Sequence, residues 1–368
     1  MTSAEQQTVA SGNAFTFSLF HQVVATDPGD NIFLSPLSAS MSFGMAMNGA
    51  KGATLDGMRT ALSLGSATLP DIDAGYKGVI DLLEGLDPTT TFRLANSIWY
   101  ADTTTPSVSF VDTTEKWFDA TVQPLNFNDA AGSLTKINGW VNTNTNGAIP
   151  TILDQFPSSD VMLLINAIDF KGQWQVKFDP GATAPGGFLA ADGSTQIVPF
   201  MNRDEHVSPE FRVGQASGAT MLELPYGGGA FVMDFLTPVS RSGPALDSLA
   251  MQLTPTMWAA LVASLQDTDA ALSIPKFTLS YERTLNDDLS ALGAGIAFST
   301  SADLAGIFPG LQTSVDFVKQ KTFVDVDESG TEAGASTVTG VVPVSLTEYS
   351  IHSPFIVAIR ERQSNTIL

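Results

Sequence analysis

The sequence predicts a single large α+β domain. Helix and strand signals alternate along its 368 residues without an internal repeat, and no Pro/Gly/Ser-rich linker divides the chain. The hydrophobic fraction of 43% is enough for a sizeable core. Together these observations exclude disorder for the bulk of the chain and favour one domain over two.

The first helix is predicted at residues 13–25, where Phe15, Leu19 and Val23 fall on one face. Residues 1–12 before it are small and polar, and we expect them to be flexible. They contain neither a basic n-region nor an apolar h-region, so no signal peptide is predicted in this chain.

Further helices are predicted from their end signals. Ser35 and Pro36 combine an N-cap residue with a proline at the first helical position, and their helix ends at Asn48-Gly49. The same kind of signal predicts helices at 54–63, at about 133–145, from Thr254-Pro255 through Leu265, and from Asn286 or Asp287 onward.

The strand signals include one stretch that is typical of a fully buried strand. The run from Val161 to Ile168 is continuously apolar except for Asn166. Three glycines at 227–229 follow Leu224-Pro-Tyr226 and predict a hairpin turn. Strands are expected within residues 91–100, 161–171, 220–237, 270–282, 315–327 and 354–361.

One segment fits no ordinary packed element. From Glu328 to Glu348 the chain runs for 21 residues without a lysine, an arginine or an aromatic ring. A structureless segment of this length inside a compact domain is unusual. Its alternate residues from Thr331 to Val341 are small and uncharged, and a strand would place them all on one face. The segment therefore fits an exposed loop or a buried central strand, and its composition also fits a flexible linker.

Nothing in the sequence indicates an enzyme. It contains no G-x-S-x-G, H-E-x-x-H, P-loop or G-x-G-x-x-G motif, and its three histidines lie far apart. The absence of cysteine excludes disulfides, thiolate catalysis and cysteine-based zinc sites. We expect no metal and no other cofactor.

The net charge restricts the possible partners. With 17 basic and 38 acidic residues the formal charge is −21. Nucleic acids and anionic membranes would repel such a chain, so neither is expected as a partner. The region around 70–85 holds Asp71, Asp73, Asp81 and Glu84 against Lys77 alone, so we do not expect it to bind a glycosaminoglycan.

Several short motifs follow one another over about 300 residues, and their order is more informative than any one of them. They are Asn31-Ile-Phe-Leu-Ser-Pro-Leu-Ser38, Asn146-Gly147-Ala-Ile149, Leu164-Ile-Asn166-Ala-Ile-Asp-Phe-Lys-Gly172, Trp174 with Phe178-Asp-Pro180, Leu224-Pro-Tyr226, Ile274-Pro-Lys276-Phe277, Ala302-Asp-Leu-Ala-Gly306, Glu328-Ser-Gly330-Thr331-Glu-Ala-Gly-Ala-Ser336 and Ser353-Pro-Phe355. This ordered set resembles the serpin family of serine protease inhibitors, and the resemblance covers essentially the whole chain.

The resemblance implies a single serpin domain over residues 1–368, with three β-sheets, eight or nine helices and an exposed reactive-centre loop at 328–349. A protease attacks the loop and forms an acyl-enzyme, and the cleaved loop then inserts into the central sheet and traps the protease. Thr331 to Val344 is 14 residues, or roughly 45 Å as a strand. At about 1 kcal/mol net per backbone hydrogen bond, insertion yields on the order of 10 kcal/mol.

The hinge of the loop favours an inhibitory member. The resemblance assigns this hinge to Glu328, Gly330, Thr331, Ala333 and Ala335. Non-inhibitory relatives tend to carry charged, proline or bulky residues in the stretch from Ala333 to Thr337, and this stretch is small throughout. The alternative is a non-inhibitory serpin that acts as a carrier, chaperone or storage protein.

Family spacing counted from the hinge places the reactive bond at Val344–Ser345. Counted back from Pro354, the loop is one residue shorter, which leaves Val342 and Leu346 as alternatives. Val342 and Pro343 beside the bond would suit a shallow apolar pocket, as in elastase-like or subtilisin-like serine proteases. The loop has no basic residue, so trypsin-like targets are not expected.

Two further sites follow from the resemblance. Ser35, Ser38, Asn166 and Gln320 match a polar cluster that controls opening of the central sheet. The family usually has a histidine where this chain has Gln320, so a pH-sensitive switch is absent there. In the region where the loop enters the sheet, Lys276 and Glu328 match a salt bridge beside Trp174.

The remaining expectations concern the setting of the protein. The partner is a serine protease held in a covalent acyl complex by a monomeric inhibitor. Family use favours a secreted or cell-surface location, and the low charged fraction with no cysteine favours a prokaryotic source. Serpins normally continue past Thr366-Ile-Leu368 with another half strand, and without it we expect the central sheet to lose pairing.

Overall fold

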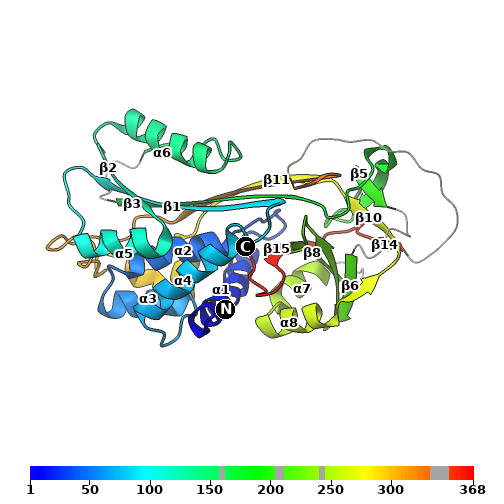
Figure 1. Ribbon diagram of the computed structural model, residues 1–368, viewed down its shortest axis with the longest axis horizontal. Helices are drawn as coiled ribbons and strands as arrows, with labels where there is room; N and C mark the ends of the chain where they lie inside the picture. The colour runs from blue at the N-terminus through cyan, green and yellow to red at the C-terminus, as the bar shows by residue number, and fades with distance from the viewer. Residues whose placement is uncertain (157–161, 204–210, 240–244, 332–347) are drawn as a thin grey trace.

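A computed structural model describes residues 1–156, 162–203, 211–239, 245–331 and 348–368 (Figure 1). These residues form nine α-helices and three β-sheets, which confirms the predicted α+β class. The helices are α1 (Ser3–Thr26), α2 (Pro36–Met47), α3 (Gly52–Ala61), α4 (Leu69–Leu83), α5 (Val108–Phe118), α6 (Ala130–Asn144), α7 (Ala245–Gln252), α8 (Pro255–Ser264) and α9 (Asn286–Leu289).

The central sheet has six strands. Their order is β11 (Phe277–Thr284), β12 (Lys319–Asp327), β13 (Gly330–Thr331), β3 (Met162–Gln173), β1 (Thr90–Ala101) and β2 (Thr121–Leu125). A four-stranded sheet has the order β14 (Glu348–Ser350), β10 (Ala271–Pro275), β5 (Thr195–Arg203) and β4 (Ala184–Leu189). A five-stranded sheet has the order β15 (Ile356–Glu361), β8 (Phe231–Pro238), β7 (Ala219–Pro225), β6 (Phe211–Ala216) and β9 (Gln266–Thr268).

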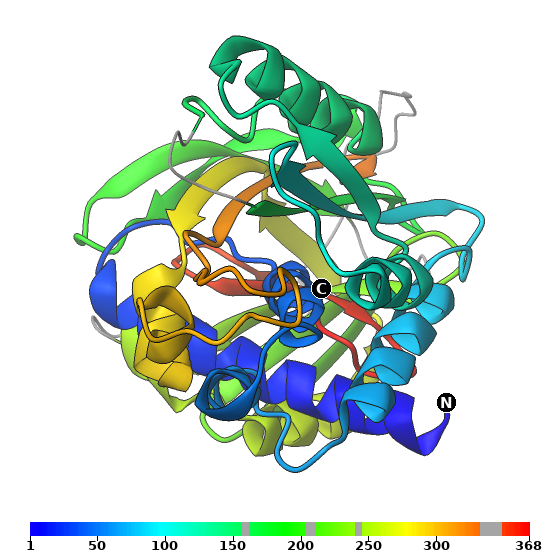
Figure 2. The same cartoon turned by 90° about the vertical axis from the view of Figure 1, so that its left-hand side faces the viewer.

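The helices cover the central sheet unequally. In Figure 1, α6 lies alone on one face, whereas α1 to α5 lie on the opposite side. Figure 2 shows α6 across the outer strands from the side. Every residue of α2 is buried, and its N-cap Ser35 accepts a hydrogen bond from the Ser38 N–H, as the sequence predicted. This helix carries part of the candidate site.

The start of α1 corrects one expectation. Residues 1–12, which we predicted to be flexible, belong almost entirely to this helix, which begins at Ser3. Thr2 and Glu5 form a capping box that satisfies the first N–H groups of the helix, and Thr8 and Val9 are buried. These polar residues are helical because a cap holds the first turn and the second turn packs against α4.

The predicted strand at 220–237 is a hairpin of two strands, β7 and β8, joined by the expected glycine turn. Gly227 and Gly229 both have positive φ, which explains the glycines there. The end of the chain corrects another expectation. Ile367 pairs with Arg360 of β15, so the last residues join the five-stranded sheet and not the central one.

Among the described residues, no helix is long and apolar enough to cross a membrane.

A buried carboxyl group on α4 gives a pH-dependent stability. Burial raises the pKa of Asp73 to about 6, against a weaker opposing effect of the hydrogen bond from Asn48. The native state then binds more protons than the unfolded chain between about pH 4 and 6, so stability falls as the pH rises through that window.

We expect Asp73→Asn to remove this pH dependence and to stabilise the protein at pH 7 by on the order of 2 kcal/mol. Urea unfolding at pH 4, 5, 6 and 7 measures both effects. Asp56→Asn, at an exposed position of α3, is the control and should leave the slope unchanged. A parallel loss of stability at every pH would contradict the prediction.

Candidate functional site

The first hinge residues lie inside the central sheet, which corrects the expected exposed loop at 328–349 for its first four residues. Gly330 and Thr331 form β13 and pair with β12 on one side and β3 on the other. Glu328, Ser329 and Thr331 are all buried. The reason is local, since the carboxylate of Asp327 accepts hydrogen bonds from the N–H groups of Ser329 and Gly330 and closes the turn.

Gly330 fits its place because it has no side chain. Its φ is +146°, and a Cβ there would lie 2.0 Å from the carbonyl oxygen of Gly172. Both the backbone conformation and the close approach to β3 therefore require glycine. The conformation turns the chain into the slot between β12 and β3.

Glu328 is held by three elements. Its carboxylate accepts hydrogen bonds of 2.8 Å from Lys276 Nζ and from Thr183 Oγ1, and its carbonyl oxygen accepts one from the N–H of Phe178. Burial alone would raise the pKa of Glu328, but the bonds from Lys276 and Thr183 outweigh it and hold this pKa below its ordinary value. The predicted pairing of Lys276 with Glu328 is thus present in the structure.

Trp174 and Tyr226 fix the other side of the hinge. The Trp174 indole N–H donates to the carbonyl oxygen of Asp327 at 2.8 Å. The backbone N–H of Trp174 donates to the carbonyl oxygen of Ser329. The two rings stack with centroids 4.6 Å apart. The Tyr226 hydroxyl is 2.8 Å from Thr331 Oγ1, which shows that the Thr331 side chain points into the protein.

We expect the coupling free energy between Lys276 and Glu328 to be small but measurable. Lys276 is 38% exposed at its side chain, and solvent screening limits the coupling free energy to about 1 kcal/mol or less. A double-mutant cycle of Lys276→Met and Glu328→Gln, followed by urea unfolding, measures it at pH 7.

The pH dependence of that coupling follows from the lowered pKa of Glu328. A depressed carboxyl pKa contributes stability above the unfolded value, and this contribution is lost as the pH falls through the folded value. The coupling should therefore persist below the ordinary range of carboxyl pKa values and disappear once the folded protein binds a proton at Glu328. A coupling that survives protonation of Glu328 would show that the pair contributes no charge interaction.

The polar cluster predicted to control sheet opening forms two adjoining parts. Gln320 on β12 accepts from the N–H of Ser35 at 2.9 Å and donates to the Ser35 carbonyl oxygen at 2.6 Å. In the second part, Ser38 donates to the side chain of Asn166 on β3, which in turn donates to Asn96 on β1. The N-terminal end of α2 thus ties β12 to β3 through neutral hydrogen bonds alone.

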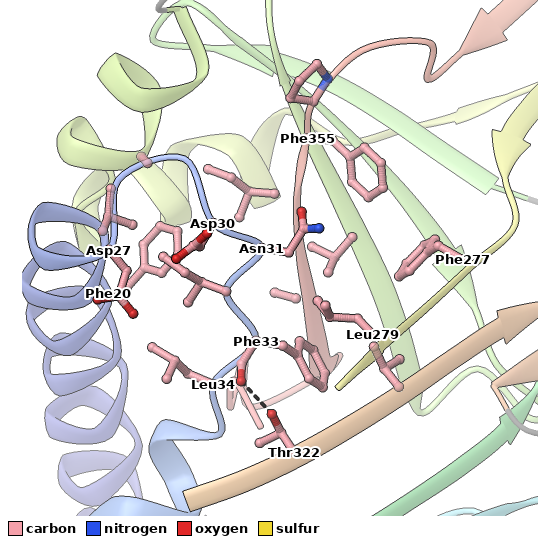
Figure 3. A pocket seen from close by; sticks show the side chains of 18 of the residues that line it. Phe20, Asp27, Asp30, Asn31, Phe33, Leu34, Phe277, Leu279, Thr322 and Phe355 are labelled. Carbon is pink, nitrogen blue, oxygen red and sulfur yellow. Dashed lines mark hydrogen bonds between the residues drawn. The ribbon is translucent and has the colours of Figure 1, made fainter. Parts of the chain in front are cut away.

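A large cavity adjoins this cluster. Its volume is about 1100 Å³, and it extends from Ser35, Ser38 and Gln320 toward α1, α7 and β15. Figure 3 shows Phe33, Phe277, Leu279 and Phe355 around this space, with the Thr322 hydroxyl donating to the Phe33 carbonyl oxygen. Thr331 also lines the cavity, so the hinge and the cluster border the same space.

The remaining predicted site residues lie outside the described residues. These are the distal hinge and the residues at the reactive bond, namely Ala333, Ala335, Val342, Pro343, Val344 and Ser345. Their roles stay predictions.

Sequence reasoning missed four partners in the site, Asn96, Phe178, Thr183 and Tyr226. Phe178 and Tyr226 lie in motifs that carried the resemblance, but nothing in their local sequence indicated a contact with the hinge. Thr183 and Asn96 carry no signal at all, because each reaches its partner from another strand or turn.

Comparison with known proteins identifies the family. The family model described as "Serpin (serine protease inhibitor)" matches residues 10–368. Serpin A3-3 of Bos taurus is 30% identical over 98% of this chain and 87% of its own length. Leukocyte elastase inhibitor A of Mus musculus is 29% identical over 99% and 98%.

A solved structure shares the fold. The crystal structure of human thyroxine-binding globulin complexed with thyroxine has a TM-score of 0.88 at 23% identity, over 100% of this chain and 97% of that one. The match to the family model over nearly the whole length shows that the chain belongs to the serpin family of serine protease inhibitors.

Proposed function

We propose that the protein inhibits serine proteases as a suicide substrate, by inserting its cleaved reactive-centre loop into the central sheet. The observation that supports this most is the position of β13. Thr331 pairs with Val326 of β12 and with Gly172 of β3, antiparallel to both. β13 therefore sets the direction and the register in which an inserting strand would continue between β12 and β3.

The register supports insertion on both sides. Thr337 lies six residues after Thr331. Gln320 lies six residues before Val326 on β12, and Asn166 lies six residues before Gly172 on β3. Insertion in the register of β13 would therefore place Thr337 opposite both Gln320 and Asn166. Insertion along this register would bring a small threonine hydroxyl to the polar cluster that ties the strands together. Because Thr331 points inward, Ala333, Ala335 and Thr337 would do the same, and all are small.

The target class follows from the sequence around the proposed bond. Val344 or Val342 would lie on the N-terminal side of the cleaved bond, where its side chain enters the specificity pocket of the protease. An elastase-like or subtilisin-like enzyme with a shallow apolar pocket is therefore favoured.

The test is incubation with an elastase-like serine protease, followed by denaturing gel electrophoresis. We expect an SDS-resistant band at the summed mass, because the acyl bond survives denaturation. Mass spectrometry should show that the released C-terminal peptide begins at Ser345. A protease inactivated at its catalytic serine is the control and should give no such band.

If only cleaved serpin accumulates at every ratio, the chain is a substrate and the inhibitory proposal is wrong. A peptide that begins at Pro343 or Thr347 would instead keep the inhibition and move the bond to Val342 or Leu346.

The second candidate is a non-inhibitory serpin acting as a carrier, chaperone or storage protein. The cavity of about 1100 Å³ favours carriage, and thyroxine-binding globulin, which shares the fold, has been solved in complex with thyroxine. This candidate predicts that no SDS-resistant complex forms and that thyroxine or a similar apolar ligand raises the melting temperature.

A further inference from the structure

The C-terminal end of α6 is bonded to the central sheet through Asn146, two residues after the helix. The side-chain amide of Asn146 donates to Asp169 Oδ2 on β3 at 2.6 Å, and its carbonyl oxygen accepts from Arg93 Nη1 on β1 at 3.1 Å. Arg93 and Asp169 lie directly opposite each other in the register of these two strands. One side chain that follows α6 therefore bonds to both members of a cross-strand pair of opposite charges.

Asparagine suits position 146 for two reasons. Its φ is +49°, in the left-handed region that Asn, Asp and Gly adopt most readily. Of these three residue types, only Asn carries a side-chain donor at neutral pH. Asp169 is 3% exposed, so its carboxylate needs donors within the protein. We call Asn146, Arg93 and Asp169 the α6 latch.

The segment that follows the latch lies across the slot between β12 and β3. Ile149 and Leu153 of this segment are buried in one cluster with Ile165 of β3, on one side of the slot. Phe317, two residues before the start of β12, packs against the same cluster from the other side. The segment 145–156 thus joins the two sides of the slot by apolar contacts on the face where α6 lies (Figure 2).

A strand that entered the slot would have to part this cluster. In the register of β13, position 338 would lie opposite Ile165 and position 340 opposite Phe317. Both positions lie an odd number of residues after Thr331, whose side chain points inward, so they would face the cluster. Insertion therefore requires the segment 145–156 to move away from the sheet, and the latch at its N-terminal end opposes that movement.

We propose that the α6 latch limits the rate at which a strand enters the slot between β12 and β3, with Asn146 as a positioning residue. This inference rests on the proposed function. The latch holds the segment 145–156 against the sheet, and loss of its two hydrogen bonds lets that segment separate from Phe317. The latch acts from the α6 side of the sheet, whereas the polar cluster of Ser35 and Gln320 ties the strands from the side of α2.

Two substitutions of Asn146 release the latch without straining the backbone. Asn146→Asp keeps the preference for a positive φ but replaces the donor with a second carboxylate beside the buried Asp169. Arg93 is exposed, so solvent screens what it gains from the new charge more than the repulsion at Asp169. Asn146→Gly also suits the positive φ and removes both hydrogen bonds.

The probe for the slot is a fluorescein-labelled, acetylated peptide with the sequence of residues 333–344, the stretch that follows β13 in the proposed register. Fluorescence anisotropy measures its rate of uptake by the full, uncleaved chain. We expect uptake to be about fivefold or more faster for Asn146→Asp and Asn146→Gly than for the parent. Hydrogen exchange read by mass spectrometry should also be about fivefold or more faster across 145–156 in both variants.

Two controls separate release of the latch from a general loss of stability. Asn142→Asp adds the same charge at an exposed position of α6 and should match the parent in both rates. Asn146→Asp combined with Asp169→Asn exchanges donor and acceptor and keeps the net charge of the parent. This double variant should restore both rates, which a defect of packing alone would not explain.

Three outcomes would overturn the proposal. Equal peptide uptake by the parent and both variants, despite faster exchange, would show that the segment does not control the slot. Equal exchange across 145–156 would show that Asn146 does not hold the segment. Both of these results would leave the proposed function intact, whereas no uptake by the parent or either variant would count against insertion itself and overturn both. If one variant does not fold, the other decides.

Discussion

Thr331→Arg is expected to abolish the SDS-resistant complex with an elastase-like protease and to leave cleaved serpin as the product. Thr331 is 4% exposed, and its hydroxyl lies against Tyr226 in the sheet. Burying a guanidinium group at this position costs several kcal/mol unless an acidic side chain pairs with it. We expect the variant to avoid this cost by keeping residue 331 outside the sheet, so that the cost enters the barrier to insertion instead. At about 3 kcal/mol, insertion slows roughly 100-fold. Deacylation would then release the protease before it is trapped.

The matched control is Glu332→Arg. Position 332 alternates with Thr331 and would carry the same guanidinium group on the outer face of the sheet. This variant should form the complex at nearly the parent yield. Melting curves after cleavage separate insertion from folding, because the cleaved parent and Glu332→Arg should gain stability and Thr331→Arg should not. Complex formation by Thr331→Arg at the parent yield would refute insertion along this register.

Arg360→Met is expected to destabilise the native state by about 3–5 kcal/mol. Arg360 is fully buried on β15, and its guanidinium donates to Asp234 Oδ2 at 2.6 Å and to Glu223 Oε2 at 2.5 Å. Glu223 keeps Arg212 and Arg362 in the variant, whereas Asp234 loses its cation. An unpaired buried carboxylate then accounts for most of the loss.

The pH dependence and a second substitution test this cause. Burial raises the pKa of Asp234 even beside Arg360. Removing the cation raises it further, so the native variant binds more protons than the unfolded chain and loses stability as the pH rises. We therefore expect a smaller defect at pH 5 than at pH 7. Arg360→Met with Asp234→Leu should recover most of the loss in urea unfolding. A double variant as unstable as the single one would assign the defect to packing.

Much of the fold could be predicted from the sequence because the residues that mark the ends of its helices are distinctive. Ser35-Pro36 and Thr254-Pro255 start α2 and α8 as expected, and the apolar run around Asn166 is the buried strand β3. α4 was missed although its signals are present. Thr68 caps it, Pro70 lies in its first turn, and its apolar positions recur at helical spacing.

Other elements had no readable signal. β4 contains Pro185 and two adjacent glycines, and it is extended because β5 supplies its partner, with Gly186 against the ring of Phe200. The buried hinge was missed for a related reason. Its residues are compatible with a loop and with a strand, and only the spacing of β12 and β3 decides between them.

The polar cluster illustrates what family resemblance adds to physical reasoning. Ser35, Ser38, Asn166 and Gln320 do lie close together, although no local pattern connects residues this distant in the chain. The resemblance grouped them, whereas the role of Asn96 as the next member appears only when β1 is paired with β3. The prokaryotic source and the elastase-like target stay predictions.

The two residues of β13 have a kinetic consequence. The first contacts of a new strand are the least favourable ones to make, because the chain loses conformational entropy before backbone hydrogen bonds compensate for the loss. With Gly330 and Thr331 already seated, this nucleation step is complete before a protease arrives. After cleavage, insertion would then proceed by adding residues one after another to the strand that β13 has begun. Its rate should depend on separating β12 from β3 ahead of the advancing strand, and little on the length of the free loop.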